Sequence, residues 1–234
     1  MRKRASKAQL DEWFGRYDHG IALIGGRVSG NFEVLDFDIG GLYEEYAEFA
    51  AREGLGDLIE SMPLIETPSG GRHLYYRCSE PVTGNQKLAY RLIAIPSEAQ
   101  FGRKVGREYV TFGGATYPVV AQAGEKYAVT IGVETRGEGG YVLTVPSLAA
   151  CHPTGKKYKL LRHTPLEVPV ITGEQRWRLL ELARAFHEHV DPSKVVGATK
   201  LSSPRQGGGK RPGDDYNERG DVLALLRRHG WDEV

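Results

Sequence analysis

Two aspartates stand two positions apart in the most strand-like stretch of the chain, Phe32–Gly40, whose Val, Leu, Phe and Ile side chains are typical of a buried strand. Side chains two apart on a strand point to the same face, so the carboxylates of Asp36 and Asp38 should lie side by side. Like charges repel there unless a cation lies between them, and carboxylate oxygens suit Mg²⁺ or Mn²⁺. The alternative is that the strand ends here and both carboxylates are solvated.

A loop between two short predicted strands, Leu64–Thr67 and Leu74–Arg77, has the chemistry of a phosphate-binding site. It offers a hydroxyl, two glycines, a guanidinium and an imidazole, from Ser69, Gly70, Gly71, Arg72 and His73. Glycines let backbone N–H groups approach a ligand, and the polar side chains add donors, so the loop suits a polyphosphate. Ser-Gly-Gly is also ordinary turn chemistry, and a lone His after a turn is often a surface or capping residue.

A third acid, Glu134, lies in a strand–turn–strand segment, Gly132–Leu143, and would be presented from the same sheet. Its alternative role is a surface carboxylate paired with Arg136. A polar segment follows, in which Lys156 and Lys157 either meet phosphates or keep the loop soluble.

The elements that must position these residues alternate between strands and helices, which is an α/β pattern. Before the acids we expect a helix over Ser6–Tyr17, whose apolar face packs in the core, and a strand over Gly20–Ile24. Helices are also predicted over Leu42–Glu53 and over Glu174–Val190, the second with Thr172 as its N-cap.

A β-rich insertion is expected at about residues 90–130. Its predicted strands are Glu108–Phe112, Tyr117–Val120 and Lys126–Thr130. The first half is basic and either grips a template or is solvated; its cations are Arg91, Arg103, Lys104 and Arg107.

Composition restricts the class of protein. The 234 residues are 40% hydrophobic with a formal charge of +1, so there is no global field for nucleic acid, and any basic surface must be local. The only cysteines, Cys78 and Cys151, exclude a disulfide framework and a zinc motif, and they favour a reducing compartment. No signal peptide or apolar run of membrane length is present, so we expect a cytoplasmic protein without a membrane partner.

In order, Asp36-x-Asp38, Ser69-Gly-Gly-Arg-His73 and Glu134-Thr-Arg-Gly-x-Gly-Gly-Tyr resemble the bifunctional primase–polymerase (prim-pol) domain of the archaeo-eukaryotic primase superfamily, found in phage and plasmid replication proteins. Pro146-Ser147, His152-Pro-Thr-Gly-x-x-Tyr158 and Asn85–Ala89 extend the likeness. The resemblance implies a catalytic domain over residues 1–190. Its α/β (α+β) fold would be an N-terminal sheet-and-helix unit packed against an RRM-like antiparallel sheet unit, with the active site in the cleft between them.

The resemblance also implies roles for residues. Asp36, Asp38 and Glu134 would be catalytic ligands of two divalent ions, Mg²⁺ or Mn²⁺, although many relatives carry Asp at the third position. The loop residues Ser69, Gly70, Gly71, Arg72 and His73 would bind the nucleotide. Contacts to phosphate or DNA would come from Lys87, Arg136, Lys156 and Lys157.

The expected function is that of a DNA primase/DNA polymerase, which joins nucleoside triphosphates on a single-stranded template or primer-template, with a replicative helicase as a further partner. Two rivals stay open: a metal-dependent nuclease, and a non-catalytic replication-initiation module that binds DNA. Residues 191–212 are predicted to be a flexible linker, and residues 213–234 a short helical segment that either begins an accessory domain or ends a stand-alone protein.

Overall fold

The computed structural model describes residues 6–15 and 19–188. By its internal contacts the chain divides into Met1–Val196 and Gly197–Val234, and every described element belongs to the first of these units. The helices are α1 (Lys7–Gly15), α2 (Leu42–Arg52), α3 (Gly56–Glu60) and α4 (Gly173–Arg184). The strands are β1 (Ile21–Ile24), β2 (Phe32–Phe37), β3 (Leu64–Glu66), β4 (Arg72–Cys78), β5 (Lys87–Ala94), β6 (Gln100–Lys104), β7 (Arg107–Phe112), β8 (Ala115–Gln122), β9 (Glu125–Arg136), β10 (Tyr141–Thr144), β11 (Lys159–Arg162) and β12 (Val170–Ile171).

Ten of the described strands form one sheet with β2 near its middle. The order is β11-β3-β4-β2-β9-β8-β7-β6, while β12 pairs with β4 and β5 with β9. All of these pairings are antiparallel except that of β12 with β4. Strands β1 and β10 form a separate antiparallel pair. The fold is therefore α+β, as expected, and the division into two packed units remains a proposal.

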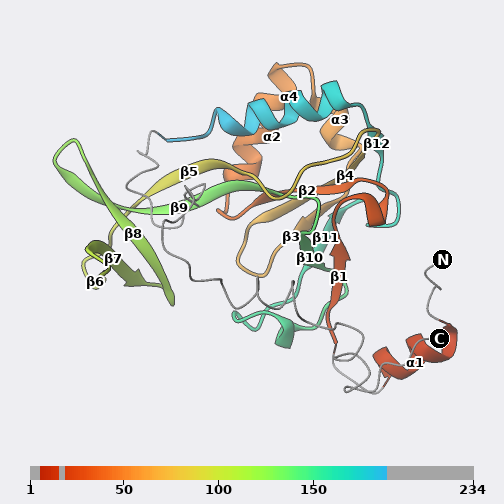
Figure 1. Cartoon of the computed structure of the whole chain (residues 1–234), viewed down its shortest axis with the longest axis horizontal. Coiled ribbons are helices and arrows are strands. Elements are labelled where there is room, and N and C mark those ends of the chain that lie inside the picture. Colours follow the sequence, from red (N-terminus) through yellow and green to blue (C-terminus); the bar gives the residue numbers. More distant parts are fainter. Residues whose placement is uncertain (1–5, 16–18, 189–234) are drawn as a thin grey trace, which may run out of the picture. The chain divides into compact units, whose positions relative to one another are not determined.

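Helices α2, α3 and α4 lie together on one face of this sheet (Figure 1). Leu35 and Phe37 of β2 point into the core beneath them, together with Tyr46 of α2 and Leu179 of α4. The intervening residues of β2 face the other way, because side chains alternate along a strand. Phe32 and Val34 therefore pack with Tyr75 and Val142 in a second cluster, and Asp36 belongs to this face. We call it the acid face and the opposite one the helix face.

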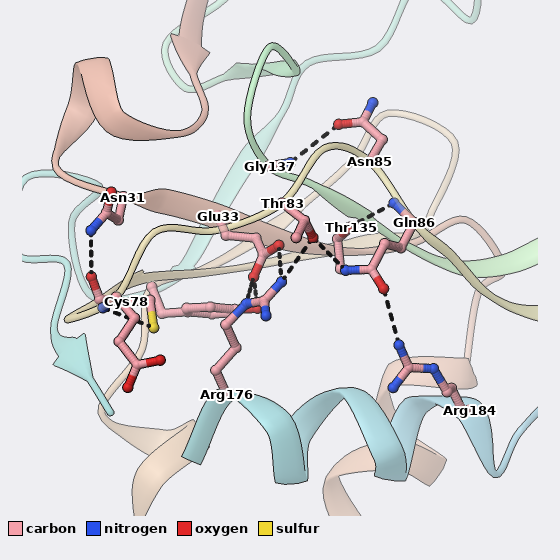
Figure 2. Close-up of polar contacts among 12 residues, drawn as sticks. Asn31, Glu33, Cys78, Thr83, Asn85, Gln86, Thr135, Gly137, Arg176 and Arg184 are labelled. Carbon is pink, nitrogen blue, oxygen red and sulfur yellow. Dashed lines mark hydrogen bonds and ion pairs between the residues drawn. The ribbon is translucent and has the colours of Figure 1, made fainter. Parts of the chain in front are cut away.

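A buried ion pair joins α4 to the central strand on the helix face. Glu33 is 0% exposed, and Arg176 of α4 donates to both of its carboxylate oxygens, at 2.5 and 2.9 Å. The Tyr76 hydroxyl donates a third hydrogen bond to Glu33 at 2.6 Å, which completes the compensation that a buried charge needs. Figure 2 shows Arg176 reaching from the helix to Glu33, with Thr83 alongside.

Strand β9 contains a bulge that inverts its side-chain alternation. Ala89 of β5 lies opposite Val133, but the next residue, Tyr90, lies opposite Ile131, so Gly132 is the extra residue. C-terminal to the bulge, Val133 belongs to the helix-side core and Glu134 to the acid face. N-terminal to it the assignment reverses, and odd-numbered residues of β9 lie on the acid face.

The free edge of β5 is covered by the residues that follow α4. The Glu188 N–H donates to the Tyr90 carbonyl at 3.0 Å, and the Tyr90 N–H donates to His187 Nδ1 at 3.1 Å. The Glu188 carboxylate also accepts from the Leu92 N–H at 2.5 Å and lies 3.0 Å from Arg91 Nε. This short segment takes the place of a further strand.

The predicted helices are present, with two differences. Thr172 caps α4 through a capping box, but the helix ends at Arg184 because the residues after it turn to β5. Core packing of the first helix is wrong: Leu10 and Trp13 of α1 are 42% and 44% exposed, because no described element covers them. In the insertion the three predicted strands are confirmed, and β6 is an additional one. The predictions for residues 191–212 and 213–234 lie outside the described residues. No described helix is both long and apolar enough to cross a membrane.

Candidate active site

Three carboxylates converge on the acid face at the middle of the sheet. Asp36 of β2 lies directly opposite Glu134 of β9 in the antiparallel register. Asp38 follows the end of β2, where its N–H donates to the Gly132 carbonyl at 3.0 Å. A carboxylate oxygen from each acid lies within 4.8 Å of the others. Donors that are all oxygen, gathered from like-charged groups, fit a hard divalent cation such as Mg²⁺ or Mn²⁺.

His73 lies on the other side of Asp36, in the neighbouring strand β4, directly opposite it in register. Its Nε2 is 3.3 Å from Asp36 Oδ1, and its Nδ1 is 3.4 Å from the Tyr75 hydroxyl. The imidazole is buried, so these two partners fix its orientation. The sheet therefore brings together the first acids and the histidine of the predicted phosphate loop.

Arg136 lies between two of the acids. Its Nε is 3.4 Å from Asp36 Oδ2, and its Nη2 forms an ion pair with Glu134. The two roles that the sequence suggests for Glu134 are therefore compatible. It pairs with Arg136, and it also lies beside Asp36 and Asp38 as a third carboxylate. The guanidinium offsets part of the negative charge of the site.

The acids differ in their affinity for protons. Burial alone raises the pKa of Asp36, but the hydrogen bond and charge of His73, together with Arg136, outweigh it and hold that pKa below its ordinary value. Partial burial, then the charges of Asp36 and Glu134, raise the pKa of Asp38 to about 8, although the exposed part of this side chain is screened by water. Burial raises the pKa of Glu134 against the lowering effect of Arg136. A site that resists full ionisation in this way favours a bound cation.

The glycines of the predicted phosphate loop have different tasks. Gly70 has φ of 96°, a left-handed conformation that closes the turn between β3 and β4. At Gly71 a Cβ atom would overlap the Phe37 carbonyl oxygen, so only glycine lets β4 begin beside β2. Ser69 is exposed at the tip of this turn, with its hydroxyl 3.1 Å from that of Thr67.

Arg72 is a loop residue whose side chain the structure directs away from the acids. It is the first residue of β4, so it points to the face opposite to that of His73. Its guanidinium lies 3.0 Å from Glu44 of α2 and 3.4 Å from Glu66. It also donates to the carbonyls of Gly70 and Gly71, which ties the turn to the helix face.

The basic residues predicted to contact phosphate or DNA lie in two places, beside the acids and beside the turn that carries Ser69. Lys87 of β5 lies opposite Glu134, and its positive charge lowers the pKa of that acid, so it belongs to the site. Lys156 and Lys157 are exposed in the segment that follows Thr154. The Thr154 hydroxyl is 3.4 Å from the Pro68 carbonyl, so this segment lies against the turn that carries Ser69.

A pocket of about 340 Å³ opens beside the acids. Its walls include Asp36, His73, Arg136, Asn85, Tyr141 and Tyr158. The sequence motifs contain the last three residues, but no role for them follows from the sequence. Tyr141 is 66% exposed at the start of β10, and an exposed aromatic residue after a glycine turn was the one signal available.

The turn between β9 and β10 explains the Gly-x-Gly-Gly spacing that precedes Tyr141. The Gly137 N–H donates to Asn85 Oδ1 at 3.1 Å, and a Cβ atom at Gly137 would overlap the Thr83 carbonyl. The Gly140 carbonyl accepts from the Gly25 N–H at 2.8 Å. These glycines let three segments close on one another and form one wall of the pocket.

Comparison with known proteins agrees with this arrangement. A protein-family model described as "Bifunctional DNA primase/polymerase, N-terminal" (Prim-Pol) matches residues 1–172 of the 234-residue chain. A search among curated proteins gave no match. The matched range contains the three acids and the loop with His73, and it ends immediately before α4.

Proposed function

Because this chain belongs to the bifunctional DNA primase/polymerase family, we propose that it is a DNA primase/polymerase that joins nucleoside triphosphates by metal-dependent nucleotidyl transfer on a DNA template. The observation that carries the proposal is the meeting of Asp36, Asp38 and Glu134 on one face of the sheet, with His73 beside them. The proposal includes a catalytic domain over residues 1–190, a two-unit arrangement around the site, and a cytoplasmic role in phage or plasmid replication with a helicase partner.

The three acids are the residues that would hold Mg²⁺ or Mn²⁺, in the two-ion arrangement that the family resemblance implies. Such ions, when bound, activate a 3′-hydroxyl and neutralise the leaving pyrophosphate. Asp36, locked between His73 and Arg136, is the ligand that stays ionised. The pKa values of Asp38 and Glu134 are raised, so a bound cation would favour the ionised form of each.

Other side chains of the site suit a triphosphate. His73 holds its Nε2 on the acid face beside Asp36, where it can donate to a phosphate oxygen bound there. Ser69 offers a hydroxyl at the exposed turn, whereas the Gly70 N–H donates within the turn to the Thr67 carbonyl at 2.9 Å. Lys87, Arg136, Lys156 and Lys157 supply positive charge around it, as phosphate recognition requires. The partly exposed Tyr141 is suited to stack on a base or sugar at the wall of the pocket.

The nuclease alternative uses the same acids but has no need for the Ser69–His73 loop. The non-catalytic alternative leaves three repelling carboxylates together without a ligand to compensate them. The non-catalytic alternative predicts no metal binding at the acids, and both alternatives predict no nucleotide incorporation.

The test is the double variant Asp36→Ala with Asp38→Ala. We expect it to lose Mn²⁺ binding by calorimetry and all extension of a labelled primer, while circular dichroism in metal-free buffer still shows a folded protein, with a melting temperature no higher than that of the wild type because the contacts of Asp36 with His73 and Arg136 are lost. The control, Glu48→Ala with Asp57→Ala, removes the same charge from exposed positions on α2 and α3. Retained extension by the first variant would overturn the assignment, and template cleavage without incorporation by the wild type would favour the nuclease.

A further inference from the structure

Strands β6, β7 and β8 form an arm that extends the sheet beyond the acids. Strand β5 occupies one edge of β9, so β2 and β8 share the other, with β2 at residues 133–136 and β8 at residues 125–128. Strands β7 and β6 add to β8 in turn. Figure 1 shows the arm at the end of β9, away from the helices. Every residue of β6 is exposed, so the arm has two open faces at its tip.

The bulge at Gly132 decides which face of the arm continues the acid face. C-terminal to the bulge, Glu134 lies on the acid face. N-terminal to the bulge, this face is formed by Ile131 and the other odd-numbered residues of β9, including Tyr127. Tyr127 lies opposite Val120, and from there the register leads to Tyr109, Arg107 and Lys104. Tyr90 is on the same face: burial and then the charge of Glu134 raise the pKa of its phenol.

Two cations on this face of the arm have no acidic partner among the described residues, although Glu125 lies on the same face and accepts from the Tyr127 hydroxyl at 2.7 Å. Lys104 and Arg107 lie directly opposite each other beside the turn Val105–Gly106. Across the described residues neither has an acidic partner, and like charges in such a pair repel. On the opposite face Glu108 accepts from Lys126 at 2.8 Å and lies across from Arg103, so one acid faces two cations there.

Aromatic side chains connect this charge to the acids. Tyr109, Tyr127 and Tyr90 are partly exposed and lie in sequence along the acid face. From Tyr127 to Glu134 the strand spans about 23 Å at 3.3 Å per residue, a length over which a nucleic-acid strand presents several phosphates. Tyrosine rings offer stacking surfaces to unpaired bases, whereas the bases of a duplex already stack on one another.

We propose that the acid-side face of the arm, formed by Lys104, Arg107, Tyr109 and Tyr127, binds the single-stranded template on its way to the acids. The proposal rests on the proposed function, since it names the template as the occupant. It assigns the first half of the insertion to DNA contact through Lys104 and Arg107, while Arg103 belongs to the other face.

The test measures binding of a fluorescein-labelled 20-residue oligothymidine by anisotropy, with the full chain in EDTA and without nucleotide. Lys104→Ala with Arg107→Ala should weaken binding on the order of tenfold at 0.1 M salt and lower the salt slope of log K by about 1.4, at about 0.7 per phosphate contact. Tyr109→Leu should weaken binding at every salt concentration and leave the slope unchanged, because stacking releases no counterions.

The matched control is Arg103→Ala with Lys126→Ala, which removes the same charge from the opposite face and should keep affinity within about twofold and the slope unchanged. A third variant, Glu108→Gln, removes the acidic neighbour of Arg103 and Lys126. It therefore adds net positive charge to the face that the proposal leaves without DNA. It should leave oligothymidine affinity unchanged. Equal loss by both double variants, or a gain of affinity in Glu108→Gln as large as the loss in Lys104→Ala with Arg107→Ala, would overturn the proposal.

Primer extension separates this proposal from the proposed function. If the wild type extends a primer and the Lys104/Arg107 variant binds oligothymidine normally, the arm proposal alone fails. If the wild type binds oligothymidine through the arm but incorporates no nucleotide with Mg²⁺ or Mn²⁺, the polymerase assignment fails and the arm remains a single-strand-binding surface.

Discussion

Arg176→Met should be among the most destabilising substitutions in the chain, although Arg176 lies four residues beyond the range that the family model matches. Its guanidinium is the cationic partner of Glu33, which is 0% exposed. Removing it leaves a buried carboxylate held only by the Tyr76 hydroxyl. Unpairing one member of a buried ion pair costs about 3–5 kcal/mol, so the free energy of unfolding should fall by that amount.

Urea denaturation followed by circular dichroism measures this loss, and a second substitution tests its cause. Glu33→Gln in the Arg176→Met background removes the stranded charge but keeps an acceptor for Tyr76, so it should recover about half or more of the lost stability, because the cost is mainly that of the uncompensated charge. Arg178→Met is the matched control on the same helix. Among the described residues Arg178 donates only to the Glu53 carbonyl, in an exposed hydrogen bond, so its loss should cost less than about 1 kcal/mol.

Two results would refute this reasoning. One is a loss below about 1 kcal/mol for Arg176→Met, which would mean that water or a neighbouring group compensates Glu33. The other is a double variant that is less stable than Arg176→Met alone, which would make the packing of α4 and not the charge the dominant effect.

Three further predictions concern the site and its boundary. His73→Ala should cost roughly 1–3 kcal/mol in kcat/KM for nucleotide while oligothymidine affinity without nucleotide stays the same, and the opposite pattern would assign His73 to the template. Because the pKa of Asp38 is raised to about 8, Mn²⁺ affinity measured by calorimetry should rise from pH 6 to 8. Over that range the metal-free protein should lose stability in urea titrations, since the folded state holds a proton that the unfolded state has released; a flat profile would contradict the shift. A chain shortened to end at Asp191 should fold and extend a primer, whereas one ending at Thr172 should fail to fold, because it lacks Leu179, Leu180 and Ala183 of the core.

Alternation along strands was enough to predict that Asp36 and Asp38 lie side by side. Asp36 and Asp38 are two apart on a run of strand-forming residues, and their convergence with Glu134 follows from β2 and β9 being neighbours. The same rule would have separated Arg72 from His73, had the start of β4 been placed two residues earlier, at Arg72 and not at Leu74. The error came from the boundary of the strand, which local propensity determines poorly.

Other features depend on partners far away in the chain. Glu33 stands in an apolar strand, and its partner Arg176 is 143 positions away, so nothing local indicates a buried ion pair. The bulge at Gly132 depends on the register with β5 and inverts the faces of half of β9. The apolar residues of α1 have helical spacing, yet spacing does not reveal whether another element covers them. Strand β6 escaped prediction because Gln100–Lys104 contains no β-branched residue.

The segment that follows α4 has a consequence for solubility. Without His187 and Glu188, the backbone groups of Tyr90 and Leu92 would lie open at an edge of the sheet, beside the apolar side chains of β5. Such an edge recruits strands from other molecules, which leads to aggregation. The charge of Glu188, paired with Arg91, resembles the charged residues by which natural sheets discourage this pairing. A chain cut before His187 would keep its whole acidic centre and still aggregate in proportion to its concentration.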